Sequence, residues 1–279
     1  MTISETFTRP VPVDPHLSMQ PRARGAAALR LKCVDGHTRI ADLRLSGSSK
    51  LLFPRTAVTT AVSLNTSGGV TGGDRFRLRL HLEAQTRAAL TTQAAERFYR
   101  AQPGQRGLVA NKITLGAGAR LNWLPQETLI FDGAHGLRAS RVEMEETAEF
   151  LAVEPLVFGR SAMGETRVAA AFEDRWNIRR GGQLVFADRL TIRGEVADMM
   201  ARFGASAMAM ASLVFVSRRS EACLERLRDT LGPLGAASLI RPGVVFARLL
   251  APDGFDLRCR LIPALTALTG APLPRTWMI

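Results

Sequence analysis

The sequence is poor in the residues that build metal cages and disulfide frameworks. It has only three cysteines, Cys33, Cys223 and Cys259, which are widely spaced and odd in number. This argues against a disulfide framework and fits a reducing compartment, so we expect a cytoplasmic protein. The four histidines are also scattered, and no C-x-x-C, H-x-H or H-E-x-x-H motif occurs. No preformed transition-metal cage is therefore expected.

Long apolar runs are missing as well. The longest apolar stretch, residues 205–216, is about half of the roughly 20 residues that a membrane-spanning helix needs. Residues 1–20 lack the apolar run of a signal peptide. We expect a soluble chain without a membrane partner, in which residues 1–22 form a flexible tail.

Lysine is scarce, because 34 of the 37 basic residues are arginines. The net charge of +12 would suit a nucleic-acid surface, but the arginines do not cluster. They alternate with apolar residues, as in Arg75-Phe76-Arg77-Leu78, which is typical of the solvent face of a strand. The pattern argues against nucleic acid and favours an acidic protein partner.

The glycine-rich segment from Asn65 to Asp74 lacks the lysine of a phosphate-binding loop. Gly68 and Gly73 have the G-x-x-x-x-G spacing, but Asp74 and Arg75 follow where lysine and serine or threonine would be needed. A carboxylate at this position would repel phosphate. The glycines therefore predict a tight connection with positive φ angles between two strands.

The signatures of a nucleophilic enzyme are also missing. No G-x-S-x-G elbow or catalytic-cysteine motif occurs, which gives hydrolase chemistry little support. Glu127 and Asp132 could form the carboxylate pair of a β-helical carbohydrate-active enzyme, which is the alternative function. A sugar-binding groove would need aromatic platforms, however, and only 6% of the residues are aromatic.

A repeat of strand pairs is what the sequence does contain. Apolar and polar residues alternate in segments such as 76–82, 113–115 and 142–144, each followed by a turn and a second apolar segment. A first shift along the chain lays Leu80 over Ile113, and a second lays Leu121 over Phe150. A third shift of similar length lays Glu154 over Asp188. Such repeats stack into solenoids and β-helices.

The pattern changes after about residue 200. Ser220 is predicted to cap a helix with the leucine stripe Leu224, Leu227 and Leu231, and Gly232-Pro233 is its stop signal. A strand is expected over residues 244–250, and Pro263 is expected at the start of another short helix.

These patterns together predict a mainly β fold. Residues 23–204 are expected to form a body of stacked, β-helix-like strand pairs. Residues 205–279 are expected to form a small α+β portion packed on that body. In the stack, corresponding corners of successive layers would place a row of polar side chains, which are Gln93, Gln126, Glu154 and Asp188.

Carboxylates beside apolar or glycine-rich segments are the remaining candidates for chemistry. Hard oxygen ligands bind divalent cations less tightly than thiolates or imidazoles, and a protein that passes a metal onward needs weak sites. For each carboxylate taken singly, a turn hydrogen bond or a salt bridge is the competing role. The candidates are Asp74, Glu96, Glu127, Asp132, Glu154, Glu165 and Asp188.

Six motifs follow one another in a fixed order from about residue 25 to the C-terminus. They are Asn65-Thr66-Ser67-Gly68-Gly69 with Gly72-Gly73-Asp74, Thr91-Thr92-Gln93-Ala94-Ala95 with Phe98-Tyr99-Arg100, Trp123-Leu124-Pro125-Gln126-Glu127 with Phe131-Asp132-Gly133-Ala134, Gly159-Arg160 with Gly164-Glu165, Asp188-Arg189-Leu190, and Pro274-Arg275-Thr276-Trp277. Together they closely resemble the UreD family of urease accessory proteins, called UreH in some bacteria. Arg97 departs from the family, which usually has lysine there, but it keeps the charge.

The resemblance implies a non-enzymatic chaperone needed for nickel incorporation into the urease active site. Such a scaffold would bind urease apoprotein together with urease accessory protein F and the urease accessory GTPase G. The resemblance also implies a largely β stack of strands and an internal polar path for nickel(II) in transit, with no permanently bound cofactor. On this sequence the metal ligands of that path would be Asp74, Glu96, Glu154 and Asp188, with Gln93 as a neutral ligand and Glu165 as a lesser candidate.

Overall fold

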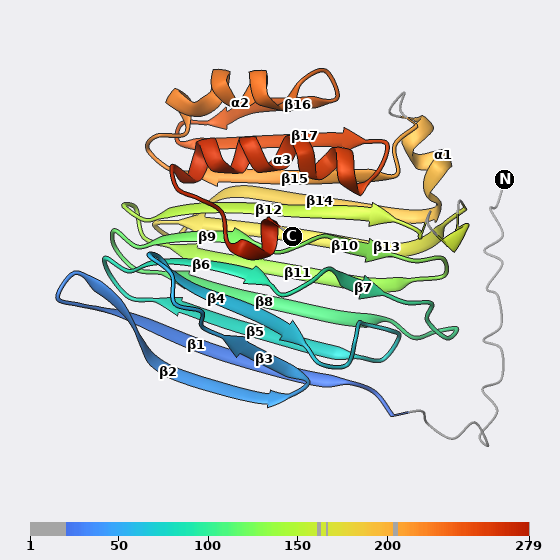
Figure 1. Cartoon of the computed structure of the whole chain (residues 1–279), viewed down its shortest axis with the longest axis horizontal. Coiled ribbons are helices and arrows are strands. Elements are labelled where there is room, and N and C mark those ends of the chain that lie inside the picture. The colour runs from blue at the N-terminus through green and yellow to red at the C-terminus, as the bar shows by residue number, and fades with distance from the viewer. Residues whose placement is uncertain (1–20, 161–162, 166, 203–205, 279) are drawn as a thin grey trace, which may run out of the picture.

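Two β-sheets stacked face to face form most of the molecule. The computed structural model describes residues 21–160, 163–165, 167–202 and 206–278. Sheet A has seven strands and sheet B has ten. The strands run side by side in layers, from β1 and β2 at one end of the stack to β16 and α2 at the other (Figure 1). The prediction of a mainly β, solenoid-like fold with a small C-terminal helix and strand portion is confirmed.

Long strands form sheet A, and sheet B combines long and short ones. In spatial order sheet A consists of β14 (Gln183–Glu195), β13 (Ala169–Arg180), β11 (His135–Met144), β8 (Gly107–Leu115), β5 (Arg75–Leu82), β1 (Arg24–Val34) and β2 (His37–Gly47). Sheet B consists of β16 (Gly235–Arg241), β17 (Val244–Ala251), β15 (Ala209–Val216), β12 (Glu149–Phe158), β9 (Arg120–Leu124), β6 (Arg87–Thr92), β4 (Thr59–Asn65) and β3 (Ser49–Leu52), with β10 (Thr128–Ile130) joining β12 to β7 (Glu96–Phe98).

The central layers have the parallel register that the repeat predicts. In sheet A, β5 pairs with β8 so that Leu80 lies beside Ile113, as the first shift predicts. In sheet B, β9 pairs with β12 so that Leu121 lies beside Phe150, as the second shift predicts. Each layer thus gives one strand to each sheet, and alternation fixes which residues point inward.

The third predicted shift, which lays Glu154 over Asp188, is wrong. After β13 the chain turns back at Gly181-Gly182, and β14 runs antiparallel in the same sheet, so that Asp188 lies opposite Trp176. Glu154 belongs to the other sheet, where it pairs with Ser212 on the antiparallel strand β15. The parallel stack therefore ends one layer earlier than the sequence pattern indicates.

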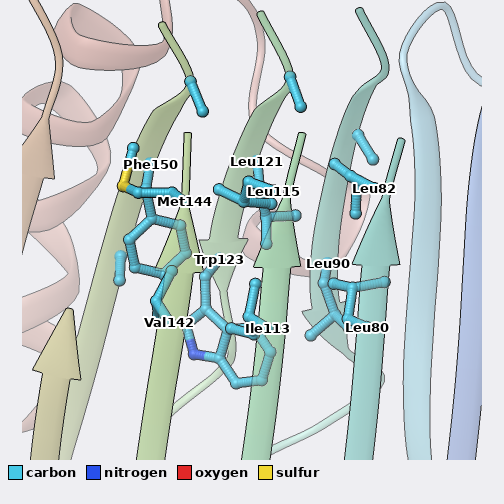
Figure 2. Packing of buried hydrophobic residues seen from close by; sticks show 14 of the residues in the cluster. Leu80, Leu82, Leu90, Ile113, Leu115, Leu121, Trp123, Val142, Met144 and Phe150 are labelled. Carbon is cyan, nitrogen blue, oxygen red and sulfur yellow. The ribbon is translucent and has the colours of Figure 1, made fainter. Parts of the chain in front are cut away.

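The main core fills the space between the two sheets. Leu80, Ile113 and Val142 point inward from sheet A, and Leu90 and Trp123 meet them from sheet B (Figure 2). Each large side chain that is removed from water in this way stabilises the fold by about 1.5–3 kcal/mol.

The C-terminal strands extend sheet B rather than forming a separate sheet. Helix α3 (Gly254–Thr269) packs against β12, β15 and β17, and α2 (Leu224–Leu231) packs against α3 and β16 (Figure 1). The predicted leucine helix is confirmed as α2. A third helix, α1 (Val196–Ala201), follows β14. Residues 203–205, where the predicted domain boundary falls, and most of the predicted tail lie outside the described residues.

Two predicted helix starts are wrong. Ser220 makes no side-chain cap hydrogen bond, and a 3-10 turn (Glu221–Cys223) separates it from α2. Pro263 lies inside α3, which instead begins at an N-cap formed by Asp253, whose side chain accepts a hydrogen bond from the Asp256 amide. A carboxylate at this position satisfies a free backbone N–H, and that decides where the helix begins.

Candidate functional site

A cavity of about 240 Å³ lies between the two sheets, beside the hydrophobic core. Its apolar wall includes Phe76, Leu78, Phe98 and Trp123. Its polar lining includes Asn65, Gln93, Glu96, Asn111, Gln126, Thr128, Arg138 and Glu154. Four of the sequence-predicted residues thus line one space, although they lie on different layers of the stack: Gln93, Glu96, Gln126 and Glu154.

A buried arginine is the centre of the polar part of this cavity. Arg138 projects inward from β11 and donates two hydrogen bonds to Asp174, from Nε at 3.1 Å and from Nη2 at 2.7 Å. Its Nη1 donates to Thr128 Oγ1 at 2.9 Å and lies 2.7 Å from Glu154 Oε2. The guanidinium therefore holds two buried carboxylates from opposite sheets, in the forked geometry that only arginine provides.

Glu154 is the carboxylate with the most unusual environment. It is 3% exposed, and its Oε1 accepts a hydrogen bond from Trp123 Nε1 at 2.9 Å. Its Oε2 is within ion-pair distance of Arg138 but has no aligned hydrogen-bond donor among the described residues. Burial raises the pKa of Glu154 to about 7, although Arg138 opposes the shift. Glu154 is thus held between Trp123 and Arg138 in the wall of the cavity.

Arg138 stays protonated and positively charged despite its burial. Burial disfavours the charged form, but Asp174 and Glu154 outweigh it and hold the pKa of Arg138 above its usual value. The cavity therefore contains a permanent cation of the protein itself, already bound between carboxylates.

Glu96 occupies the cavity beside the glycine-rich loop. It is half-buried at the start of β7, and it accepts hydrogen bonds from Asn65 Nδ2 at 3.2 Å and from the Arg97 amide at 3.0 Å. Burial raises the pKa of Glu96, although these hydrogen bonds oppose the shift. Gln93 is an exposed member of the same lining.

A second, much smaller cavity shares Glu154 with the first. Its volume is about 10 Å³, roughly the space for one water molecule, and both Glu154 and Asp188 line it. Asp188 accepts a hydrogen bond from Arg248 Nη2 at 2.8 Å, and Arg248 Nε also donates to Ser212. Glu154 therefore stands between the large cavity and the ion pair of Asp188 with Arg248.

Asp74 and Glu165 line neither cavity. Asp74 is buried, but its two oxygens accept hydrogen bonds from the backbone amides of Ala23 at 2.7 Å and Thr71 at 2.8 Å. It thereby fixes the turn from Thr71 to Asp74, which contains two of the glycines, and the predicted positive φ angles are confirmed at Gly68, Gly69 and Gly73.

Glu165 links the segments that follow β10 and β12. It forms an ion pair with Arg160 at 3.1 Å and accepts a hydrogen bond from the Asp132 amide at 3.3 Å. Asp132 itself pairs with Arg100, and Glu127 pairs with Arg258 at 2.9 Å. The two carboxylates of the alternative enzyme reading are thus each engaged by a different arginine, which gives that alternative no support.

The structure lacks two features in the residues that it describes, a clustered metal site and a membrane-spanning helix. In the part of the chain that the structure describes, no three His, Cys, Asp or Glu side chains gather closely enough to hold a metal ion. Of the candidate ligands, Gln93, Glu96, Glu154 and Asp188 are instead spread along the two cavities. No helix in the described ranges is both long enough and apolar enough to cross a bilayer.

Arg138 and Asp174 are the site residues that the sequence analysis missed. Both residues occupy the alternate strand positions that point inward. Arg138 shares this side of β11 with Ser140 and Val142, and Asp174 shares this side of β13 with Phe172 and Trp176. A charged residue on the inward phase of a strand is costly unless it is paired. That phase is the signal that could have found them.

Comparison with known proteins places the chain in a family. The family model described as UreD urease accessory protein matches residues 23–278. The urease accessory protein UreD of Roseobacter denitrificans is 45% identical over 263 residues, covering 93% of this chain and 96% of that protein. Those of Ruegeria pomeroyi and Rhizobium etli are 46% and 44% identical, covering 90% and 99% of this chain and 99% of each relative. The chain therefore belongs to the UreD family of urease accessory proteins.

Proposed function

We propose that this protein is a scaffold in urease maturation, needed for nickel incorporation into the urease active site. It acts without catalysing a reaction, and it binds urease apoprotein together with urease accessory protein F and the urease accessory GTPase G. The family match over residues 23–278, and relatives named as accessory proteins, support this role.

Nickel(II) is the cargo in this proposal, and the two cavities are its route. The observation that carries this part is that Glu154 lines both of them. Gln93 and Glu96 then serve at the large cavity, and Asp188 serves beyond Glu154. Amide and carboxylate oxygens hold divalent cations weakly, which suits a metal that must be released. Asp74 and Glu165 lie outside both cavities, and the route does not use them.

Arg138 sets the chemistry of the route. It lies 2.7 Å from Glu154 Oε2, so a divalent cation that approaches this oxygen meets a positive charge already in place. Repulsion between the two cations keeps the metal bound weakly, and it favours onward movement over storage. The guanidinium also keeps Glu154 and Asp174 paired when no metal is present, which avoids uncompensated buried charge.

The scaffold role is tested by association. Purified chain is mixed with urease apoprotein, accessory protein F and the GTPase G, alone and in combination, and complexes are separated by size-exclusion chromatography. We expect co-elution with urease apoprotein in the presence of the accessory partners. A chain that associates with none of these proteins would overturn the proposed function.

The route is tested by nickel loading. Urease is matured with the parent chain, with Glu154→Ala or with Asp188→Ala, and its nickel content is measured by mass spectrometry. We expect both variants to lower the nickel content while binding the partners normally. Glu225→Ala is the matched control, because Glu225 is an exposed carboxylate on α2, far along the stack from the large cavity. Parent-like nickel content with Glu154→Ala and Asp188→Ala would contradict the route.

A further inference from the structure

The outer face of sheet A carries a row of cations on three neighbouring strands. Arg79 on β5 lies in register with Lys112 on β8, and Lys112 lies in register with Arg141 on β11. All three side chains are exposed. Because neighbouring strands are about 4.8 Å apart, the three charges span about 10 Å. Like charges that face each other across strands destabilise a sheet, so this row is unfavourable for the isolated chain.

The cations of this row lack an ion-pair partner in the described part of the chain. None of the three forms an ion pair with any residue that the structure describes. By contrast, Glu173 on the same face neutralises Arg175 and Arg189, at 2.7 Å and 3.0 Å. On this face Glu173 thus pairs with two arginines of β13 and β14, whereas Arg79, Lys112 and Arg141 have no ion-pair partner among the described residues. The nearest carboxylate along β11 is Glu143, which follows Arg141 at the next outward position and forms no ion pair with it.

An apolar strip lies beside the row. Arg77 is in register with Ala110, and Ala110 is in register with Ala139. In the next row, Leu108 lies beside Leu137. Ala110 is exposed and the other three apolar residues are half-buried. The row of cations borders the strip on one side, and the arginines of β5 border it along its edge. Protein interfaces typically have such an apolar centre with a polar rim, and arginine is enriched in them.

The same face is poorly suited to nucleic acid. The outward-facing residues of β5, β8 and β11 in the described chain include no phenylalanine, tyrosine or tryptophan on which a base could stack, and their only aromatic rings are the imidazoles of His81 and His135. The apolar strip also interrupts the cations where a phosphate backbone would need contacts.

We propose that the outer face of β5, β8 and β11 docks a protein whose surface carries carboxylates around an apolar centre. The inference rests on the proposed function, because it takes this partner to be one of the three assembly proteins named above. Docking neutralises the row of Arg79, Lys112 and Arg141 and covers the apolar strip.

The test is a charge reversal with a matched control. The triple variant Arg79→Glu, Lys112→Glu, Arg141→Glu is compared with Arg55→Glu, Arg218→Glu, Arg226→Glu, which changes the net charge equally at exposed positions elsewhere. A third variant, Ala110→Gln, blocks close approach to the strip without altering charge. Binding to urease apoprotein, accessory protein F and the GTPase G is measured separately by surface plasmon resonance at two salt concentrations, and thermal unfolding confirms that each variant is folded.

The outcomes separate the two proposals. We expect the first triple variant to weaken binding to one of the three proteins by ten-fold or more, Ala110→Gln to weaken the same complex, and the control set to change it by less than two-fold. Equal binding by the parent and the first triple variant overturns the docking surface alone, as does equal loss in the control set. Binding of a short DNA duplex more tightly than any of the three proteins also overturns it. A parent chain that binds none of the three overturns both the docking surface and the proposed function.

Discussion

Replacing Glu154 by glutamine removes a titration that burial shifts to about pH 7, and it should change how stability depends on pH. In the folded protein the pKa of Glu154 is raised from 4.5 to about 7, chiefly by burial. The unfolded chain therefore releases this proton at lower pH than the folded protein. The contribution of the protonated carboxyl to stability is fully present below about pH 4.5, and it is lost as the pH rises through about 7.

The size of the effect follows from the shift. One pKa unit corresponds to about 1.4 kcal/mol, so the parent protein should lose roughly 2–3 kcal/mol of unfolding free energy between pH 5 and pH 8 relative to Glu154→Gln. The assay is urea unfolding followed by circular dichroism at intervals across this pH range. Glu143→Gln, at an exposed position on β11, is the control and should follow the parent. Parallel profiles for the parent and Glu154→Gln would show that the ion pair with Arg138 outweighs burial, and this would refute the reasoning.

Three further substitutions test the packing around the site. Arg138→Met leaves Asp174 and Glu154 buried without a counter-charge, so it should lower the free energy of unfolding, measured in urea, by about 3–5 kcal/mol. Adding Asp174→Asn should recover part of this loss. A loss below about 1 kcal/mol would contradict the prediction. Gly69→Ala places a methyl group against the Tyr99 ring and the Arg97 carbonyl and should lower the free energy of unfolding by about 1–3 kcal/mol. Gly68→Ala places its methyl group in open space, so it should cost only the strain of a positive φ, about 1 kcal/mol. Equal losses of melting temperature in the two variants would argue against the packing at Gly69. Trp277 is only 1% exposed, and its ring nitrogen donates a 2.9 Å hydrogen bond to the backbone of β9. Trp277→Ala leaves a cavity there, so calorimetry should show a loss of about 3–5 kcal/mol in the free energy of unfolding. An unchanged melting temperature would contradict the packing of the C-terminus against β9.

The parallel layers could be predicted because alternation sets both the strand and its phase. Leu80, Ile113 and Val142 recur at the inward phase, and the structure places them in one column of sheet A. The reversal at Gly181-Gly182 could not be predicted in the same way. A hairpin and a solenoid corner both use glycine at positive φ, and only pairing between distant strands distinguishes them.

The site was predicted in part for a related reason. Glu96, Glu154 and Gln93 follow apolar segments, and the stack brings such positions to one cavity. Arg138 was hidden among many arginines, most of which alternate outward, as Arg141 does on the same strand. Its partner Asp174 comes from the next strand of sheet A, so the pair exists only once β11 and β13 are aligned.

The column through Leu80, Ile113, Val142 and Ile178 shows where this fold accepts changes of length. The stretch of chain that joins one member to the next differs in length from layer to layer, yet the members lie side by side in sheet A. The differences are absorbed in the turns and short strands between the long strands. Extra residues at a corner leave both neighbouring layers as they are. A single insertion within β8 would exchange the environments of Ile113 and Lys112, which would place a charge in the core and an isoleucine in water.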